Sequence, residues 1–260
     1  MQPLQTLHFV NRATEQQRRK DQAMAKKIRI LIVEDEEAIR QGLVDLFVFH
    51  GYDVETAEDG RTGLEKATNG TYDLIILDVM LPAVDGFTIC NAVRKKSREQ
   101  PIIMLTAKTT DNDIITGLTL GADDYIAKPF SVRELVLRVE SVLRRSRRLT
   151  EDAREIQIGA YLTIDTKNLL GRYLDGSIEN APTLEFTRRE VEILRYLQLH
   201  QDRPVSRAEL LLEVWGYQKA SSIETRTVDI HIAKLRKKIE PNPKAPIHLV
   251  TVRGEGYKLL

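Results

Sequence analysis

Apolar residues between Ile28 and Arg148 follow two alternating patterns. Short, mostly aliphatic runs, typical of strands buried on both faces, alternate with segments whose apolar residues recur at helical spacing. The predicted strands are Ile28–Val33, Asp53–Ala57, Leu74–Leu77, Pro101–Leu105 and Asp124–Ala127. The predicted helices are Glu36–His50, Arg61–Thr68, Phe87–Lys95, a segment near Asp113–Leu120, and Val132–Arg148. Five such units predict an α/β fold, a (βα)5 doubly wound parallel sheet covered by helices on both faces.

The pattern changes after residue 155. Short alternating stretches between Ile156 and Leu184 are interrupted by glycine, proline and Asp-Gly, which predicts hairpins of a small antiparallel sheet. Helical spacing then returns at Thr187–His200, Arg207–Val214 and Thr225–Ile239, and the last residues, HLVTVRGEGYKLL, predict two strands around a glycine-rich turn. We therefore expect an α+β domain to follow the α/β domain.

Charged segments mark the expected domain boundaries. Residues 1–25 are polar and predict a flexible arm, residues 26–148 form the first domain, the charge-dense residues 149–155 a linker, and residues 156–260 the second domain. Met24 stands directly before AKKIRILIVEDE, so translation starting at Met24 instead of Met1 is a hypothesis that N-terminal sequencing would test.

Composition excludes several classes of protein. With 260 residues, 42% of them hydrophobic, the chain is able to form two cores, and no apolar run approaches the ~20 residues that span a bilayer. No signal peptide is evident, so we expect a cytoplasmic protein without a membrane partner. Cys90 is the one cysteine and lies in an apolar helical pattern, which favours a core thiol over a nucleophile. The five histidines are dispersed and predict no zinc site.

The small net charge of +1 hides an asymmetry between the halves. Residues 25–130 carry 12 basic and 18 acidic residues, whereas residues 156–260 carry 16 basic and 13 acidic ones. The nets of −6 and +3 weakly indicate that only the second half contacts a polyanion.

Polar residues converge where the predicted strands of the first domain end. Glu34 and Asp35 follow the first strand, Asp78 ends the third, Thr106 the fourth and Lys128 the fifth. Ligands of such sheets bind at this carboxyl edge. Three carboxylates packed together repel, and Mg²⁺ relieves the repulsion because it prefers hard oxygen ligands. With Lys128 opposite, the site would stabilise a negatively charged group carried on Asp78.

Four motifs give the first domain a close resemblance to a known family. LIVEDE, LDVMLPAVDG, LTA and GADDYIAKPF make residues 28–148 similar to the receiver domain of a two-component response regulator. The resemblance implies that a sensor histidine kinase phosphorylates Asp78, and that Asp35 and Asp78 hold Mg²⁺ with support from Glu34 and the backbone carbonyl of Met80. It also implies that Lys128 pairs with a phosphoryl oxygen and is joined to Pro129 by a cis bond.

The same resemblance assigns a switch and a pairing surface. Thr106 would hydrogen-bond the phosphoryl group, and Tyr125 would fill the space that Thr106 leaves. Receivers of the family pair through salt bridges, for which Asp123, Asp124 and Arg138 stand at matching positions, with Arg145 as a further candidate.

The predicted helix Thr225–Ile239 has two distinct faces. Val228, Ile232, Leu235 and Ile239 form an apolar stripe that should pack on the second domain. VSRAELLLEVWGY, RTVDIHIAKLRKKIE and TVRGEGYKL make residues 156–260 similar to the winged-helix-turn-helix DNA-binding domains of the OmpR/PhoB family. The resemblance implies that one set of residues faces the major groove: Arg226, Thr227, Ile230, His231 and Lys234.

Further DNA contacts follow from that resemblance. Arg236 would bind a phosphate, and Arg253, in the wing, would enter the minor groove. Tyr257 is assigned either to a phosphate or to the core. Ala233 departs from several relatives, which carry a basic residue there. The loop Val214–Ser222 lies where the family touches RNA polymerase, although Trp215 is equally typical of core packing.

These observations predict a non-enzymatic transcription factor that is activated by phosphorylation. Phosphorylated on Asp78, it would form a homodimer through the first domain and bind paired half-sites in promoter DNA. One alternative is a DNA-binding regulator that uses the receiver only for dimerisation, independently of phosphorylation. Another is an aspartyl-phosphate phosphatase, which is disfavoured because Met80 occupies the place of the required second acid.

Overall fold

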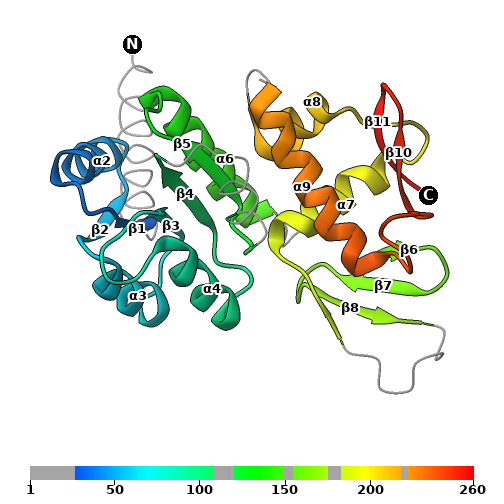
Figure 1. Ribbon diagram of the computed structural model, residues 1–260, viewed down its shortest axis with the longest axis horizontal. Coiled ribbons are helices and arrows are strands. Elements are labelled where there is room, and N and C mark those ends of the chain that lie inside the picture. The colour runs from blue at the N-terminus through cyan, green and yellow to red at the C-terminus, as the bar shows by residue number, and fades with distance from the viewer. Residues whose placement is uncertain (1–26, 108–116, 118–119, 149–154, 175–182, 218–221) are drawn as a thin grey trace, which may run out of the picture.

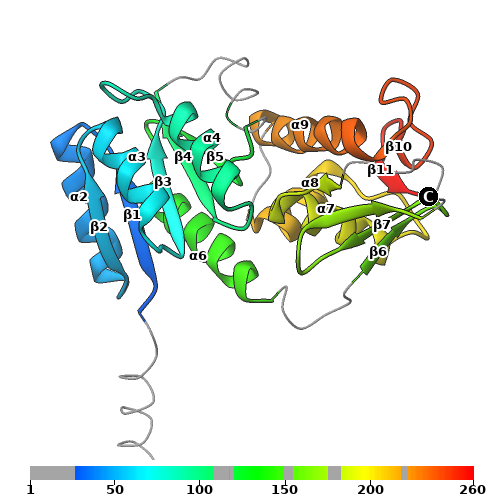
Figure 2. The same ribbon diagram turned by 90° about the horizontal axis from the view of Figure 1, so that it is seen from below.

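The computed structural model describes residues 27–107, 117, 120–148, 155–174, 183–217 and 222–260. The predicted N-terminal arm, nearly all of the predicted helix Asp113–Leu120 and nearly all of the linker lie outside these residues. Figures 1 and 2 show two domains side by side, the first around a parallel sheet and the second formed by helices and small antiparallel sheets.

The first domain is built on a five-stranded parallel sheet. Its strands are β1 (Arg29–Val33), β2 (Asp53–Ala57), β3 (Leu74–Asp78), β4 (Ile102–Thr106) and β5 (Asp124–Ala127). Their order is β2-β1-β3-β4-β5, so the winding direction reverses between β1 and β3. All residues of β3 and β4 are buried, as continuous apolar runs predict. The fold class and all five strands predicted from the sequence are confirmed, with ends that differ by at most one residue.

Helices cover both faces of this sheet. They are α2 (Glu37–Phe49), α3 (Gly60–Asn69), α4 (Gly86–Lys96) and α6 (Val132–Arg148). Phe47 of α2 and Leu135 and Val139 of α6 lie in the core on one face, whereas Ile89 and Cys90 of α4 lie in the core on the other. Cys90 is fully buried, and burial raises the pKa of its thiol to about 11, so it behaves as the predicted core residue.

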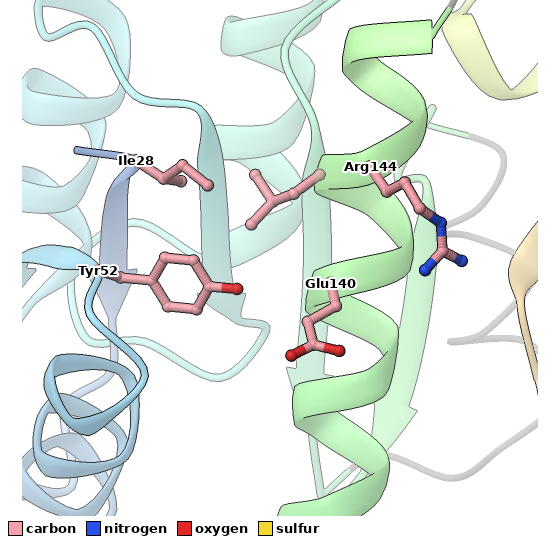
Figure 3. A pocket seen from close by; sticks show the side chains of 5 residues that line it. Ile28, Tyr52, Glu140 and Arg144 are labelled. Atoms are coloured by element: carbon pink, nitrogen blue, oxygen red, sulfur yellow. The ribbon is translucent and has the colours of Figure 1, made fainter. Parts of the chain in front are cut away.

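The amino edge of the sheet carries a groove of about 460 Å³. Ile28 and Tyr52, which precede β1 and β2, line it together with Glu140, Leu143 and Arg144 of α6. Tyr52 points across the groove toward α6 (Figure 3). The groove lies at the opposite edge from the predicted acidic site and takes no part in it.

The second domain contains the predicted antiparallel strands and helices. Its four-stranded sheet consists of β6 (Glu155–Ile158), β7 (Leu162–Asp165), β8 (Leu170–Tyr173) and β9 (Leu184–Glu185). The hairpin of β10 (Leu249–Val252) and β11 (Gly256–Leu259) closes the chain. Gly254 and Gly256 have φ of +79° and +135°, which the turn between these two strands requires.

Three helical segments complete this domain. They are α7 (Arg188–Leu199), α8 (Arg207–Leu210) continuing into the π-helix η1 (Leu211–Trp215), and α9 (Ser222–Ile239). The sequence predicts an uninterrupted helix over Arg207–Val214, whereas the structure changes to wider π turns at Leu211 and ends at Gly216, which has a φ of +74°. The predicted stripe of α9 is confirmed: Val228, Ile232, Leu235 and Ile239 all lie in the core.

Two glycines of the first domain provide a test of the packing. A Cβ at Gly86 would lie 2.1 Å from the backbone oxygen of Asp78, whereas one at Gly42, exposed on α2, would meet nothing within 4 Å. We therefore expect Gly86→Ala to lower the free energy of unfolding by about 1–3 kcal/mol. Gly42→Ala should instead raise it by about 0.5–1 kcal/mol. Urea denaturation measures both, and equal effects of the two changes would contradict this account of the α4–β3 contact.

Candidate functional site

The acidic cluster lies where the sheet reverses its winding direction. Glu34 and Asp35 directly follow β1, and Asp78 is the last residue of the neighbouring β3. Lys128 follows β5 and reaches across this edge. Its Nζ donates hydrogen bonds to Glu34 Oε1 and Oε2, at 2.9 and 2.7 Å, and to Asp78 Oδ2, at 2.6 Å. The structure therefore brings Glu34, Asp78 and Lys128 together, as the sequence predicts.

Burial makes the charges at this site interdependent. Glu34 and Asp78 are only 1% and 4% exposed. Burial raises the pKa of Glu34 to about 7; the hydrogen bond from Lys128 opposes this rise, and the negative charge of Asp78 adds to it. Burial lowers the pKa of Lys128, but its hydrogen bonds to Asp78 and Glu34 outweigh that effect and raise the pKa above its usual value. Lys128 is therefore held protonated between two carboxyl groups.

The carboxylates also form a set of ligand atoms that suits a divalent cation. One oxygen from each of Glu34, Asp35 and Asp78 lies within 4.8 Å of the others. Asp35 is exposed while the other two are buried, so a cation at this position would be open to water on one side. Hard oxygen ligands with room for water fit Mg²⁺.

The loop after β3 holds the Asp78 carboxylate in place. Met80 N donates a hydrogen bond to Asp78 Oδ1 at 3.0 Å, and the Met80 side chain is 54% exposed. Asp85 caps α4 by accepting a hydrogen bond from Thr88 N, and Gly86 allows α4 to begin directly against the end of β3. Local hydrogen bonds thus fix Asp78, and its surroundings on the loop side stay accessible.

The remaining predicted residues of the first domain lie along the adjacent strands. Thr106 ends β4 and is fully buried, and Tyr125 of β5 is 7% exposed. The Lys128–Pro129 bond is cis, as predicted. Asp123 pairs with Arg94 at 2.8 Å, and Asp124 pairs with Arg138 at 3.2 Å. The side chain of Arg145 lies outside the described part of α6.

The residues predicted to read the major groove have different environments in this structure. Arg226 is exposed and Lys234 is partly buried, but Thr227, Ile230 and His231 are 5%, 8% and 0% exposed. Ile230 lies in the same hydrophobic cluster as Met104 and Tyr125 of the first domain. The first domain therefore covers this side of α9.

The predicted wing and phosphate contacts lie beyond that covered region. Arg253 is exposed in the turn between β10 and β11, and Arg236 is held by hydrogen bonds to Leu249 O and Thr251 Oγ1, both at 2.8 Å. Tyr257 is 4% exposed, and its hydroxyl donates to Asp229 Oδ1 at 2.5 Å. Of the two roles left open for Tyr257, this arrangement favours the core, with the hydroxyl bound to Asp229 of α9.

Two residues near these surfaces were not singled out from the sequence. Arg207 pairs with Asp229 at 2.6 Å and donates to the Tyr257 hydroxyl, and Tyr217 donates a hydrogen bond to Asp124 of the first domain. The Tyr217 contact joins residues 93 positions apart, so neither periodicity nor motif spacing indicates it. Trp215 is 1% exposed, which agrees with the core alternative for that residue.

Comparisons with known proteins identify both domains. A family model described as response regulator receiver domain matches residues 30–140, and one described as transcriptional regulatory protein, C terminal, matches residues 180–259. PhoP, the transcriptional regulatory protein of alkaline phosphatase synthesis in Bacillus subtilis, is 43% identical over 233 residues, 89% of this chain and 96% of that protein. The sensory transduction protein RegX3 of Mycobacterium bovis is 37% identical, over 88% of this chain and 98% of that protein.

A solved structure shows a likeness that includes both domains. A mutant of RitR aligns with a TM-score of 0.68 and 26% identity, covering 90% of this chain and 99% of that one. The chain therefore belongs to the OmpR/PhoB family of two-component response regulators. It joins a receiver to a transcription-regulatory DNA-binding domain, and its relatives are transcriptional regulators. In the described parts of the chain no helix is long and apolar enough to cross a membrane.

The charge compensation by Lys128 provides a test of the site. Lys128→Met leaves two buried carboxyl groups without their cation, and we expect it to lower the free energy of unfolding by about 3 kcal/mol in metal-free buffer. Because the pKa of Glu34 is raised, Glu34 ionises in the folded protein only as the pH rises through about 7. The stability lost in Lys128→Met should grow over this range, because the ionised carboxylate then lacks its cation. Urea denaturation over this pH range measures both effects.

Lys95→Met is the matched control, because Lys95 is exposed at the end of α4. This change should alter stability by no more than about 0.5 kcal/mol. Mg²⁺ should recover part of the stability lost in Lys128→Met, since it restores positive charge between the carboxylates. Equal losses in the two variants, or a loss that does not change with pH, would contradict the role assigned to Lys128.

Proposed function

We propose that this response regulator is phosphorylated on Asp78 by a sensor histidine kinase and then binds promoter DNA as a homodimer. The observation that carries the proposal is the position of Lys128, which lies 2.6 Å from Asp78 and is held there by Glu34. A phosphoryl group adds about −1.5 to −2 charge and three acceptor oxygens. Lys128 is already placed to receive one of these oxygens in exchange for the Asp78 carboxylate.

The transfer needs an oriented nucleophile. An oxygen of the Asp78 carboxylate attacks the phosphorus of the donor in line, the bond from phosphorus to the donor's nitrogen breaks, and that nitrogen keeps the electron pair. Lys128 stabilises the charge on the equatorial oxygens, and Met80 N orients the acceptor carboxylate. Thr106, at the end of β4, is the proposed hydroxyl donor to the product, with Tyr125 responding on β5.

Asp35 and Asp78 are the proposed ligands of Mg²⁺, with Glu34 supporting them and the Met80 carbonyl as a further ligand. The cluster of carboxylate oxygens within 4.8 Å supports this assignment, as does the exposed position of Asp35. Bound Mg²⁺ would neutralise negative charge on the transferring phosphoryl group. The receivers of this family typically bind Mg²⁺ through acidic residues, which fits the donors present here.

DNA binding is proposed for α9 and the wing. Arg226, Thr227, Ile230, His231 and Lys234 would face the major groove, with Arg236 on a phosphate and Arg253 in the minor groove. The exposed positions of Arg226 and Arg253 support the outer part of this surface. The binding-competent form must have a different arrangement of the domains, because the receiver covers Ile230 in this structure.

Pairing of two receivers is proposed to use Asp123, Asp124 and Arg138 on β5 and α6, with Arg145 as a further candidate. A contact of the loop Val214–Ser222 with RNA polymerase stays a prediction, since residues 218–221 lie outside the described chain. The phosphorylation-independent alternative is less well supported, because Glu34, Asp78 and Lys128 retain the contacts that phosphoryl chemistry needs.

Phosphorylation is tested by mass. The full chain, incubated with a small phosphodonor and Mg²⁺, should gain a single phosphoryl adduct, and Asp78→Ala should gain none. Asp35→Asn should retain Asp78 but form the adduct more slowly and with a weaker dependence on Mg²⁺, because one proposed ligand is lost. An undiminished adduct in Asp78→Ala would contradict the assignment of the phosphoacceptor.

The wing is tested by a pair of charge changes. Arg253 and Glu255 are both exposed in the turn that joins β10 to β11. Arg253→Ala should weaken binding of the phosphorylated chain to duplex DNA and reduce the salt slope by about 1. Glu255→Ala should leave the slope unchanged or strengthen binding. Fluorescence anisotropy against salt concentration measures both, and identical slopes would show that Arg253 does not contact DNA.

A further inference from the structure

A tyrosine of the DNA-binding domain binds the charged face of the receiver. The Tyr217 hydroxyl donates a hydrogen bond to Asp124 Oδ1 at 2.6 Å and accepts one from the Arg138 guanidinium. The centre of this guanidinium also lies 3.9 Å from the centre of the Tyr217 ring. Asp124 and Arg138 are themselves joined at 3.2 Å, and all three side chains are buried. Tyr217 therefore completes an ion pair of the receiver from the other domain.

Two hydrogen bonds to backbone oxygens flank this contact. Ser141 Oγ of α6 donates to Trp215 O at 2.9 Å, two residues before Tyr217. Arg189 Nε of α7 donates to Asp123 O at 3.3 Å, next to Asp124. The end of η1 and the start of α7 thus meet β5 and α6 directly. The stability of such a buried tyrosine–carboxylate–guanidinium group depends on its geometry. Water is excluded, so the side chains depend on one another for hydrogen bonds.

The contact has a consequence for α9. Ile230 enters the hydrophobic cluster of the receiver, and Thr227 and His231 are buried. His231 has no hydrogen-bond partner at either ring nitrogen among the described residues, and burial together with nearby lysines and Arg189 holds its pKa well below its usual value. Ile230, one of the side chains proposed to meet DNA, is therefore covered by the receiver, whereas the His231 ring packs against Trp215 of its own domain, with the ring centroids 5.3 Å apart. Ile230 is not available to DNA while the contact around Tyr217 holds the two domains together.

We infer that Tyr217 is an intramolecular latch, which docks the DNA-binding domain on the Asp124–Arg138 pair that two receivers would otherwise use to pair with each other. This inference rests on the proposed function for the roles of α9 and of receiver pairing. Docking and pairing need the same two side chains, so the closed monomer and the paired receiver exclude each other. Pairing frees the covered side of α9, and the closed form suppresses both DNA binding and pairing before phosphorylation.

The latch predicts a defined change in apparent affinity. When the competent form is a small fraction of the protein, the measured dissociation constant exceeds the intrinsic one by the inverse of that fraction. Removing a hydrogen bond to a charged group shifts the opening equilibrium by on the order of 10-fold. The unphosphorylated chain should therefore bind DNA on the order of 10-fold more tightly once the Tyr217 hydroxyl is removed.

The experiment compares two tyrosine-to-phenylalanine changes in the full-length, unphosphorylated protein. Tyr217→Phe removes the latch hydroxyl and keeps the ring. Tyr196→Phe is the matched control, because its hydroxyl also bonds a carboxylate, Glu209, at 2.8 Å, but entirely within the DNA-binding domain. We expect Tyr217→Phe alone to increase the radius of gyration in small-angle scattering. It should also increase affinity for a mixed-sequence duplex library and self-association in sedimentation, while phosphorylation by a small donor is retained.

The outcomes separate the latch from the proposed function. An unchanged radius of gyration in Tyr217→Phe, with dimensions like those of wild type and Tyr196→Phe, overturns the latch whether or not DNA binds. Dimensions that depend on protein concentration in wild type overturn the intramolecular assignment and indicate a contact between copies. If Tyr217→Phe opens the protein but neither it nor the phosphorylated wild type binds DNA, the latch stands as a domain contact and the proposed DNA function fails.

Discussion

The pairing of Lys128 with two carboxyl groups is the interaction on which the receiver site depends. Glu34 and Asp78 reach the carboxyl edge at the end of adjacent buried strands, where each alone would carry a large cost of desolvation. Lys128 arrives from a third strand and binds both. The arrangement leaves net negative charge at the edge, which suits the site to the proposed Mg²⁺, and it holds the Lys128 cation against Asp78. The same excess of negative charge that costs stability makes this edge a candidate cation site.

The two domains contact each other at the face formed by β5 and α6. β5 is four residues long and carries Asp124 and Tyr125, and Lys128 follows directly after its last residue. At roughly 3.3 Å per residue, Lys128 and Asp124 lie about 13 Å apart along the strand. One short strand therefore connects Lys128, which binds Asp78, with Asp124, which binds Tyr217. In the proposed mechanism, a second copy and the DNA-binding domain would compete for Asp124 at the start of this strand.

Local sequence patterns predicted most of the fold, because strands and helices depend largely on residues that lie close together in the sequence. Continuous apolar runs identified the strands, and strand–helix alternation identified the parallel sheet. The stripe Val228, Ile232, Leu235 and Ile239 gave the buried side of α9 correctly. Motif spacing predicted that Glu34, Asp78 and Lys128 lie at one edge, because the strands of a parallel sheet all end on the same side. The change from α8 to π turns at Leu211–Trp215 had no such signal.

What the sequence did not predict is the burial of Ile230, His231 and Tyr217, and the reason is physical. Periodicity separates the face of a helix that meets its own domain from the opposite face, but it does not identify what covers the opposite face. On α9, aliphatic Ile230 lies among residues suited to DNA, and in this structure it meets the receiver core instead. A surface proposed to bind DNA in one state and protein in another needs a mixed composition that suits both. Ile230 is therefore buried by a contact that the proposed DNA-binding form would have to release.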